Sequence, residues 1–454
     1  MQYSTFAAID IGSYDVILEI FEISKKQGIR SVDKICHRME LGKDTYTLGK
    51  IRPEMEEELC RVLADFVRIM EGYRVDDYRA TASSAISEAS NSLYVLGKIH
   101  QLTGLSVTVL SNSEQRFLSY KALAAMEDNF NKIIEKGTAI LDLDGGSFQI
   151  SLFDKDALVT TQNIRMGSLR IRERLAGIQS ETEHYEEMVE ELIWNEVSSF
   201  KKMYLKDRKI ENIMLIGDVF TDSVYQNIEE KTTKIISREN FNTWYEKIIR
   251  QSPMELAVKL GIPLENASLM YPSAVIYKCL IDMMGAEHIW IPGVHMTRGI
   301  AYEYAEQMKL LKGGHNFEND ILMAAKNIGK RYAVNRPHVQ NLEMTALAMF
   351  DATKKMHGMK ERERLLLQMA VMLHDVGKYI SFNNVADSSY NIIMSNEIIG
   401  LSHIEREMVA LIARYNTVTL PSYDELVMES SLSAEQYLTV SELTAIAVSY
   451  THLR

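Results

Sequence analysis

The sequence is poor in cysteine and lacks long apolar runs. Only three of its 454 residues are cysteines, and their wide separation fits neither a disulfide framework nor a metal site, which favours a reducing cytoplasmic location. The first residues lead directly into a predicted strand without a basic segment. No apolar stretch is long enough to span a bilayer, so we expect neither a signal peptide nor a membrane partner.

Positively charged residues are also fewer than negatively charged ones. Fifty Lys and Arg residues face 62 Asp and Glu residues, which gives a formal net charge of −12 and argues against a general nucleic-acid-binding protein. A polyanionic substrate is not excluded, because lysines and metal ions can reverse the local potential inside a cleft.

The chain is too long for a single hydrophobic core, and about three domains are expected. Alternating strand and helix patterns predict α/β structure in the first two thirds, including a helix over residues 53–73. Beyond Gly313 and Gly314 the strand signal nearly vanishes and helical spacing dominates. We therefore predict two α/β lobes, residues 1–124 and 125–311, a linker near 312–316, and an all-α domain over 317–454.

Two segments about 130 residues apart share one plan, which is an apolar run, an Asp, an apolar residue and a turn rich in Gly and Ser. They are Ala8-Ile9-Asp10-Ile11-Gly12-Ser13 and Ile140-Leu141-Asp142-Leu143-Asp144-Gly145-Gly146-Ser147. A single copy is explained by an Asp that closes its own turn. Two copies at domain-sized separation predict a duplicated fold with a nucleotide or polyphosphate cleft between its halves.

Together with residues 79–85, 166–170 and 374–378, these segments resemble the exopolyphosphatase/guanosine pentaphosphate phosphatase (Ppx/GppA) family of the actin-like ATPase superfamily. The resemblance is to the subgroup with a C-terminal His-Asp (HD) domain. It implies a two-lobed, actin-like (ribonuclease H-like) α/β module, whose last helix returns to the first lobe, followed by an all-α HD-like domain. It also implies a homodimer that hydrolyses terminal phosphate from inorganic polyphosphate or guanosine pentaphosphate with Mg²⁺.

Such chemistry needs carboxylates that hold Mg²⁺, backbone amides that bind phosphate oxygens, and a side chain that orients the attacking water. The resemblance assigns Asp10 and Asp142 to the metal and the water. The residues that it assigns to phosphate binding are Gly12, Ser13, Gly145, Gly146, Ser147 and Gly217.

Several positions depart from the family pattern. The family has Ser-Gly-x-Glu-Glu-Ala where residues 111–116 read Ser-Asn-Ser-Glu-Gln-Arg. Gln115 therefore replaces the catalytic Glu, and an amide can orient water but cannot accept its proton. Glu114 is the alternative, one residue away and about 100° around the helix. If Gln115 limits the rate, Gln115→Glu should raise it.

Other departures affect the glycine-rich turns. Asp144 replaces the first Gly of a Gly-Gly-Gly turn, and Val219 and Phe220 stand where loop glycines would leave room for a ligand. The scaffold thus persists while catalytic positions have changed. This leaves a second hypothesis, a non-catalytic sensor that keeps the cleft for binding.

In the predicted helical domain, His338, His374 and Asp375 match the first three ligands of an HD metal site. A fourth Asp is expected on a late helix that this chain does not reach. We predict that the three residues lie close together but hold no metal tightly, which weakens a further alternative, an HD-type phosphohydrolase. Residues 447–454 do not continue the family's helix, and we expect a truncated terminus.

Overall fold

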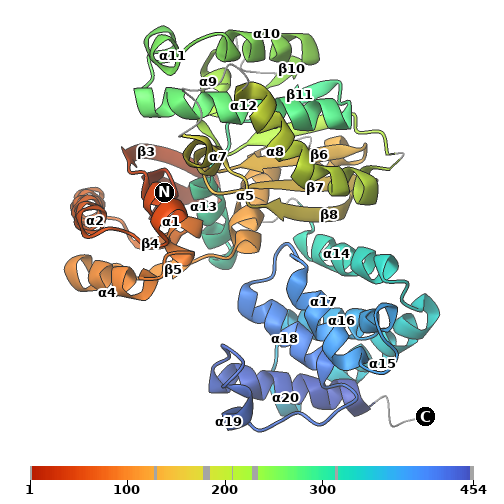
Figure 1. The fold of residues 1–454 in the computed structure, drawn as a ribbon. Helices are drawn as coiled ribbons and strands as arrows, with labels where there is room; N and C mark the ends of the chain where they lie inside the picture. Colours follow the sequence, from red (N-terminus) through yellow and green to blue (C-terminus); the bar gives the residue numbers. More distant parts are fainter. Residues whose placement is uncertain are drawn as a thin grey trace. The chain divides into compact units, whose positions relative to one another are not determined.

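The computed structural model describes residues 3–126, 130–176, 185–206, 208–227, 234–311 and 315–449. They form two compact units, which are described separately (Figure 1). Unit 1 comprises Met1–Ala157 and Gln162–His315, and unit 2 comprises Leu158–Thr161 and Asn316–Arg454. Within the described ranges, no helix has the length and apolar character needed to cross a membrane. The predicted linker at 312–316 lies partly outside these ranges, and the predicted domain boundaries stay predictions. The helix was predicted not to continue from residue 447, but α20 (Ala434–Ser449) runs through Ser449, and the residues after it lie outside these ranges.

The first sheet has five strands in the order β3-β2-β1-β4-β5. They are β1 (Ser4–Ile11), β2 (Asp15–Ser24), β3 (Gly28–Arg38), β4 (Asp77–Ala82) and β5 (Val107–Val109). Strand β1 pairs antiparallel with β2 and parallel with β4. Because successive side chains alternate across a strand, Ala7 and Ile9 enter a different core cluster from Phe6 and Ala8.

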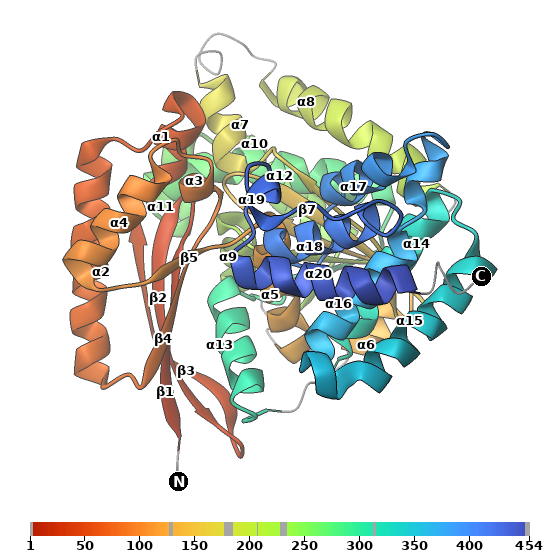
Figure 2. The ribbon, with the colours of Figure 1, turned by 90° about the horizontal axis from the view of Figure 1, so that it is seen from below.

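Helices cover both faces of this sheet (Figure 2). Helices α2 (Pro53–Tyr73) and α4 (Ser92–Thr103) lie on the Ile9 side, whereas α13 (Met296–Gln307) packs against Phe6 and Ala8. The bounds of α2 match the predicted helix, with Pro53 in the first turn, where its missing N–H costs no helical hydrogen bond. Although α13 follows the second sheet in the chain, it contacts β1 and β2 of the first.

The second sheet repeats the first. Its order is β10-β11-β9-β6-β7-β8, so that β8-β7-β6-β9-β11 corresponds to β3-β2-β1-β4-β5, with β10 added at the edge. The central strand β6 pairs antiparallel with β7 and parallel with β9, as β1 does with β2 and β4. The strands are β6 (Thr138–Leu143), β7 (Phe148–Asp154), β8 (Ala157–Ile164), β9 (Asn212–Ile216), β10 (Ile235–Ser237) and β11 (His288–Trp290). The shared order confirms the duplication that the paired motifs predicted.

The remaining helices of unit 1 connect and flank these strands. They are α1 (Leu41–Leu48), α3 (Ser84–Ser87), α5 (Asn112–Met126), α6 (Phe130–Ile134), α7 (Ser168–Leu175), α8 (Tyr185–Phe200), the π-helical η1 (Lys201–Leu205), α9 (Val219–Asn227), α10 (Arg238–Ile249), α11 (Pro253–Leu260) and α12 (Leu264–Met284). Helix α5 packs along α13, which places its first turn beside the ends of the central strands.

Apart from Leu158–Thr161, the described part of unit 2 is helical, as the loss of strand signal predicted. Its elements are α14 (Phe317–Arg331), α15 (Arg336–His357), α16 (Glu361–Leu373), the 3₁₀ helix η2 (Val376–Tyr379), α17 (Val385–Ser395), α18 (His403–Arg414), α19 (Tyr423–Leu426) and α20 (Ala434–Ser449). Helix α16 is central, because it contacts α14, α15, α18 and α20. Nearly all of its last nine residues are buried.

Candidate active site

Asp10 and Asp142 occupy equivalent places in the two sheets, each next to last in the central strand of its sheet. Both line one cavity of about 270 Å³. Four further carboxylates line the same cavity, those of Asp15, Asp144, Asp218 and Asp222. The structure therefore brings the two predicted carboxylates together, inside a larger acidic group than the sequence analysis foresaw.

Several of these carboxylates are held in an environment that disfavours their charge. Burial raises the pKa of Asp10 well above its ordinary range, and the negative charges of Asp15 and Asp144 add to the effect. Burial also raises the pKa of Asp142, although Arg116 opposes it. The pKa of Asp218 is raised to about 7, again chiefly by burial.

Three buried oxygen atoms of this group, Asp10 Oδ1, Asp142 Oδ2 and Asp218 Oδ2, have no well-aligned hydrogen-bond partner within the described residues. Such atoms are costly unless a cation or a donor completes them. The hydroxyls of Ser119 and Ser273 do approach the carboxylates of Asp142 and Asp218 and lower their pKa. Carboxylate oxygens are the donors that Mg²⁺ prefers, with one or two carboxylates supplemented by substrate phosphates. The donor set of the cavity therefore fits Mg²⁺.

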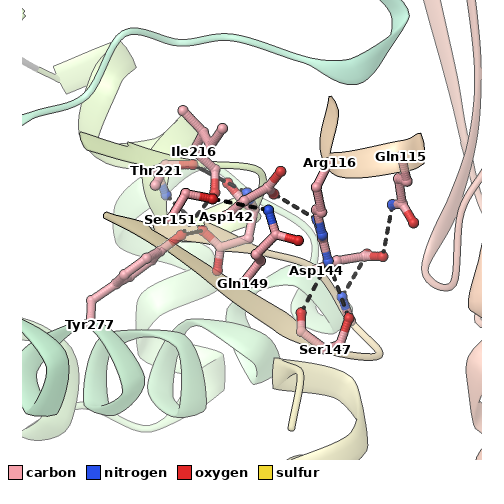
Figure 3. A network of polar contacts seen from close by, with 12 residues as sticks. Gln115, Arg116, Asp142, Asp144, Ser147, Gln149, Ser151, Ile216, Thr221 and Tyr277 are labelled. Carbon is pink, nitrogen blue, oxygen red and sulfur yellow. Dashed lines mark hydrogen bonds and ion pairs between the residues drawn. The ribbon is translucent and has the colours of Figure 1, made fainter. Parts of the chain in front are cut away.

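The first turn of α5 separates the two candidates for orienting water. Glu114 Oε2 accepts hydrogen bonds from the backbone N–H of Ser111 at 2.9 Å and from its hydroxyl at 2.7 Å, so this carboxylate caps its own helix. Gln115 lines the cavity, and its Nε2 donates to Asp144 Oδ2 at 3.3 Å (Figure 3). Of the two, Gln115 is the residue that faces the site.

Arg116, which the sequence analysis did not single out, lies at the centre of the polar network (Figure 3). Its Nη1 donates to Asp142 Oδ1 at 2.7 Å, and its Nη2 lies 3.2 Å from Ser147 Oγ. The side chain is only 3% exposed. The family pattern has Ala at this position, so the only sequence signal was a charged residue in place of a small apolar one.

The two strand-end turns already use some of their backbone amides. The N–H of Gly12 donates to the carbonyl of Asp15 at 2.8 Å, and the N–H of Gly145 donates to Asp144 Oδ1 at 2.6 Å. Both glycines line the cavity. The Asp144 carboxylate thus accepts a bond that a bound anion could otherwise accept.

The other predicted phosphate-binding residues contact protein groups. The Ser13 hydroxyl is 2.7 Å from the hydroxyl of Tyr46, and Ser147 Oγ accepts from Arg116. A Cβ on Gly146 would collide with the Tyr46 hydroxyl. These three residues therefore fix the shape of the turns through contacts with other protein groups.

Gly217 follows β9 and closes the cavity beside Asp142. Its φ of +105° suits glycine alone, and a Cβ there would lie 2.5 Å from Leu143 O and 2.6 Å from Asp142 Oδ1. Phe220 is fully buried against Phe241 and Tyr277. Phe220 therefore fills core volume and not the ligand space that its replacement of a loop glycine predicted, whereas Val219 does line the cavity.

Asp15, Asp218 and Asp222 also line the cavity and were not predicted as site residues from the sequence. For Asp218 a signal was available, because it follows Gly217 directly at the end of a predicted strand. The Tyr277 hydroxyl donates to Asp218 Oδ1 at 3.3 Å, and no local pattern announces this contact between residues 59 positions apart.

In unit 2, donor atoms of His338, His374 and Asp375 lie within 4.8 Å of one another, which makes them the one group of possible metal ligands found within the described residues. This confirms the predicted proximity. His374 Nδ1 is 2.7 Å from the carbonyl of Val371, which can only accept, so Nδ1 carries a proton. Its Nε2 lies 3.4 Å from Asp375 Oδ1, and Lys378 Nζ lies 2.5 Å from Asp375 Oδ2. A cation of the chain itself therefore already balances Asp375.

Two models of one protein family match most of this chain. Residues 20–308 match the Ppx/GppA phosphatase family, and residues 322–454 match domain III of Ppx/GppA phosphatases. The chain belongs to the Ppx/GppA phosphatase family. The predicted HD subgroup is not supported, because the helical unit is matched as domain III of this family. A local His-Asp pair with one distant His was too little to distinguish the two.

Two curated relatives are similar to this chain at low sequence identity. A guanosine-5'-triphosphate,3'-diphosphate pyrophosphatase of Vibrio atlanticus is 19% identical over 99% of this chain and 87% of its own length. A bifunctional 3-dehydroquinate synthase/phosphatase of Fusobacterium nucleatum is 21% identical over 62% of this chain, and the match spans 44% of that protein.

The crystal structure of an exopolyphosphatase from Cytophaga hutchinsonii is 17% identical with a TM-score of 0.60, covering 67% of this chain and 98% of its own. That of an Aquifex aeolicus Ppx/GppA family member is also 17% identical, with a TM-score of 0.56 and coverage of 68% and 99%. The two-lobed, actin-like α/β fold is thereby confirmed.

Proposed function

We propose that the protein hydrolyses the terminal phosphoanhydride bond of inorganic polyphosphate or of guanosine pentaphosphate. One observation carries the proposal, namely that equivalent carboxylates of the duplicated sheets, Asp10 and Asp142, line a single cavity and each keep a buried oxygen without a well-aligned hydrogen-bond partner among the described residues. Family membership and the printed activities of the relatives support it.

Asp10 and Asp142 would hold Mg²⁺, which when bound neutralises charge on the phosphoryl oxygens. Gly12, Gly145 and Gly217 leave the cavity open to a phosphate, since each lines it without a side chain. The turn residues Ser13, Gly146 and Ser147 would support phosphate binding by fixing the shape of the loops.

Gln115 is the proposed water-orienting residue, since Glu114 is engaged in capping α5. An amide cannot take the proton of the attacking water. Asp218 is the proposed acceptor of that proton, because it lines the cavity, has an oxygen without a well-aligned hydrogen-bond partner among the described residues and has a pKa raised to about 7.

The second candidate is a sensor that binds the same ligands without turnover. It is favoured by the network of Gln115, Arg116 and Asp144, whose polar groups bond to Asp142 and to the glycine turn inside the site. A homodimer and a cytoplasmic location stay predictions, and light scattering of the full chain would test the first.

The deciding experiment measures phosphate release from long-chain polyphosphate and from guanosine pentaphosphate with Mg²⁺. Asp142→Ala should abolish release. The matched control is Asp154→Ala, which removes a partly exposed carboxylate from the neighbouring strand β7. Release that survives Asp142→Ala contradicts the proposed site, and tight binding without release by the unmodified protein favours the sensor.

A further inference from the structure

Arg116 is a buried cation at a position where the family pattern has Ala. Burying an ion pair is costly, and its attraction seldom repays the desolvation of both groups. The pair between Arg116 and Asp142 is also incomplete, since Arg116 Nε and Asp142 Oδ2 have no well-aligned hydrogen-bond partner within the described residues. An arrangement selected only for stability would satisfy those atoms or replace them with apolar groups.

The geometry of Arg116 suits an anion of the size of phosphate. A guanidinium presents several N–H donors in one plane and binds phosphate oxygens through two of them at once. Arg116 lines the cavity and reaches both Asp142 and Ser147, at the end of β6 and in the turn that follows. Its charge is therefore held beside the turn that the family resemblance assigns to phosphate.

We propose that Arg116 is a phosphate-binding residue of this cleft, held in place by Asp142 until a phosphate ligand replaces Asp142 as its partner. The proposal deepens the proposed function and depends on it only for the identity of the natural ligand. It implies that Arg116 and a metal ion compete for Asp142, because Asp142 Oδ1 cannot accept a hydrogen bond from Arg116 and be fully available as a metal ligand at the same time. Freed from Asp142, the guanidinium would turn both its donors to phosphoryl oxygens.

The test is calorimetric titration of the full chain with inorganic tripolyphosphate in EDTA, where no metal contributes. Arg116→Ala should weaken binding about 10- to 100-fold, the value of hydrogen bonds from a charged donor. Asp142→Asn should strengthen binding, because it releases the guanidinium from its partner. These opposite signs separate a ligand-binding arginine from one that only supports the fold.

Arg116→Ala leaves Asp142 buried without its partner and could destabilise the chain. The double variant Arg116→Ala with Asp142→Asn removes both charges, and it should bind tripolyphosphate as weakly as Arg116→Ala alone. The matched control is Arg68→Ala, on the exposed face of α2, where the side chain is 73% exposed. Thermal unfolding of every variant checks that each is folded at the titration temperature.

A second titration uses Mg²⁺ alone. Arg116→Ala should bind Mg²⁺ more tightly than the unmodified protein, since Asp142 is then free. The proposal is overturned if the unmodified chain does not bind tripolyphosphate in EDTA, if Arg116→Ala binds it equally well, or if Asp142→Asn weakens binding. Absence of phosphate release with Mg²⁺ would instead contradict the proposed hydrolysis and leave the role of Arg116 intact.

Discussion

The contact between Gln115 and Asp144 changes the effect that we expect of Gln115→Glu. The sequence alone predicted that this substitution raises the rate of hydrolysis. Gln115 Nε2 donates to Asp144 Oδ2 at 3.3 Å. In Gln115→Glu, a carboxylate would face Asp144 at that distance. Two unit charges so placed repel by up to about 5 kcal/mol at an effective dielectric constant of about 20. The repulsion raises the pKa of the new glutamate, which then keeps its proton near pH 7 and cannot act as a base.

We therefore expect Gln115→Glu alone to leave hydrolysis of polyphosphate nearly unchanged. Combined with Asp144→Gly, which restores the glycine of the family pattern, it should raise the rate about 10²- to 10⁴-fold, the usual contribution of a positioned general base. The second change also frees the Gly145 amide from Asp144 Oδ1. The assay is initial phosphate release at pH 7 with saturating Mg²⁺ for both single variants and the double variant.

The double-mutant cycle measures the coupling between the two positions directly. If Gln115→Glu alone gives as large a gain as the double variant, the charge of Asp144 does not control this position. If the double variant gives no gain and Glu114→Gln abolishes release, the water is oriented by Glu114. In that case the alignment of α5 with the family pattern is wrong by one residue.

Three further changes test other parts of the structure. Gly217→Ala should destabilise the fold by about 1–3 kcal/mol, because its φ is +105° and its Cβ would meet Leu143 O at 2.5 Å; an unchanged urea midpoint would contradict this. The pKa of Asp218 is raised from 3.8 to about 7 in the folded protein, so the folded state retains a proton that the unfolded state loses, and the free energy of unfolding should fall as pH rises from about 4 to 7. Asp218→Asn should flatten that fall in urea titrations and lower hydrolysis, whereas an unaltered pH profile would contradict both. In unit 2, elemental analysis after dialysis should find no stoichiometric Mn²⁺, Fe or Zn²⁺, because Lys378 balances Asp375; retained metal that is lost on His374→Ala would overturn this.

The duplicated sheets could be predicted because their signal is local. Each central strand carries an apolar run that ends in Asp and a glycine turn, and strand order follows from the way such units fold. The helix over Pro53–Tyr73 was equally accessible from proline placement and spacing. Even the role of Glu114 had a local signal, since Ser111 and Glu114 have the spacing of a capping box. That spacing should have counted against Glu114 as a residue of the site.

The central contact of the site had no such signal. Arg116 and Asp142 come from α5 and β6, 26 residues apart in the chain, and only the tertiary fold brings them to 2.7 Å. The sequence shows a charged residue in place of Ala, which is equally compatible with a solvent-exposed helix face. The high pKa of Asp10 depends on burial, on Asp15, which lies just across the β1–β2 turn, and on Asp144, which approaches through tertiary structure.

The departures from the family pattern are coupled, and this bears on whether the cleft still works. Gln115, Arg116 and Asp144 each replace a residue of different charge or polarity, yet Gln115 bonds to Asp144 and Arg116 bonds to Asp142. The hydrogen bonds made by these three residues keep most polar groups of the cleft paired. A cleft whose chain supplies its own cation should bind phosphate before it binds metal, and phosphate release on addition of Mg²⁺ then separates the hydrolase from the sensor.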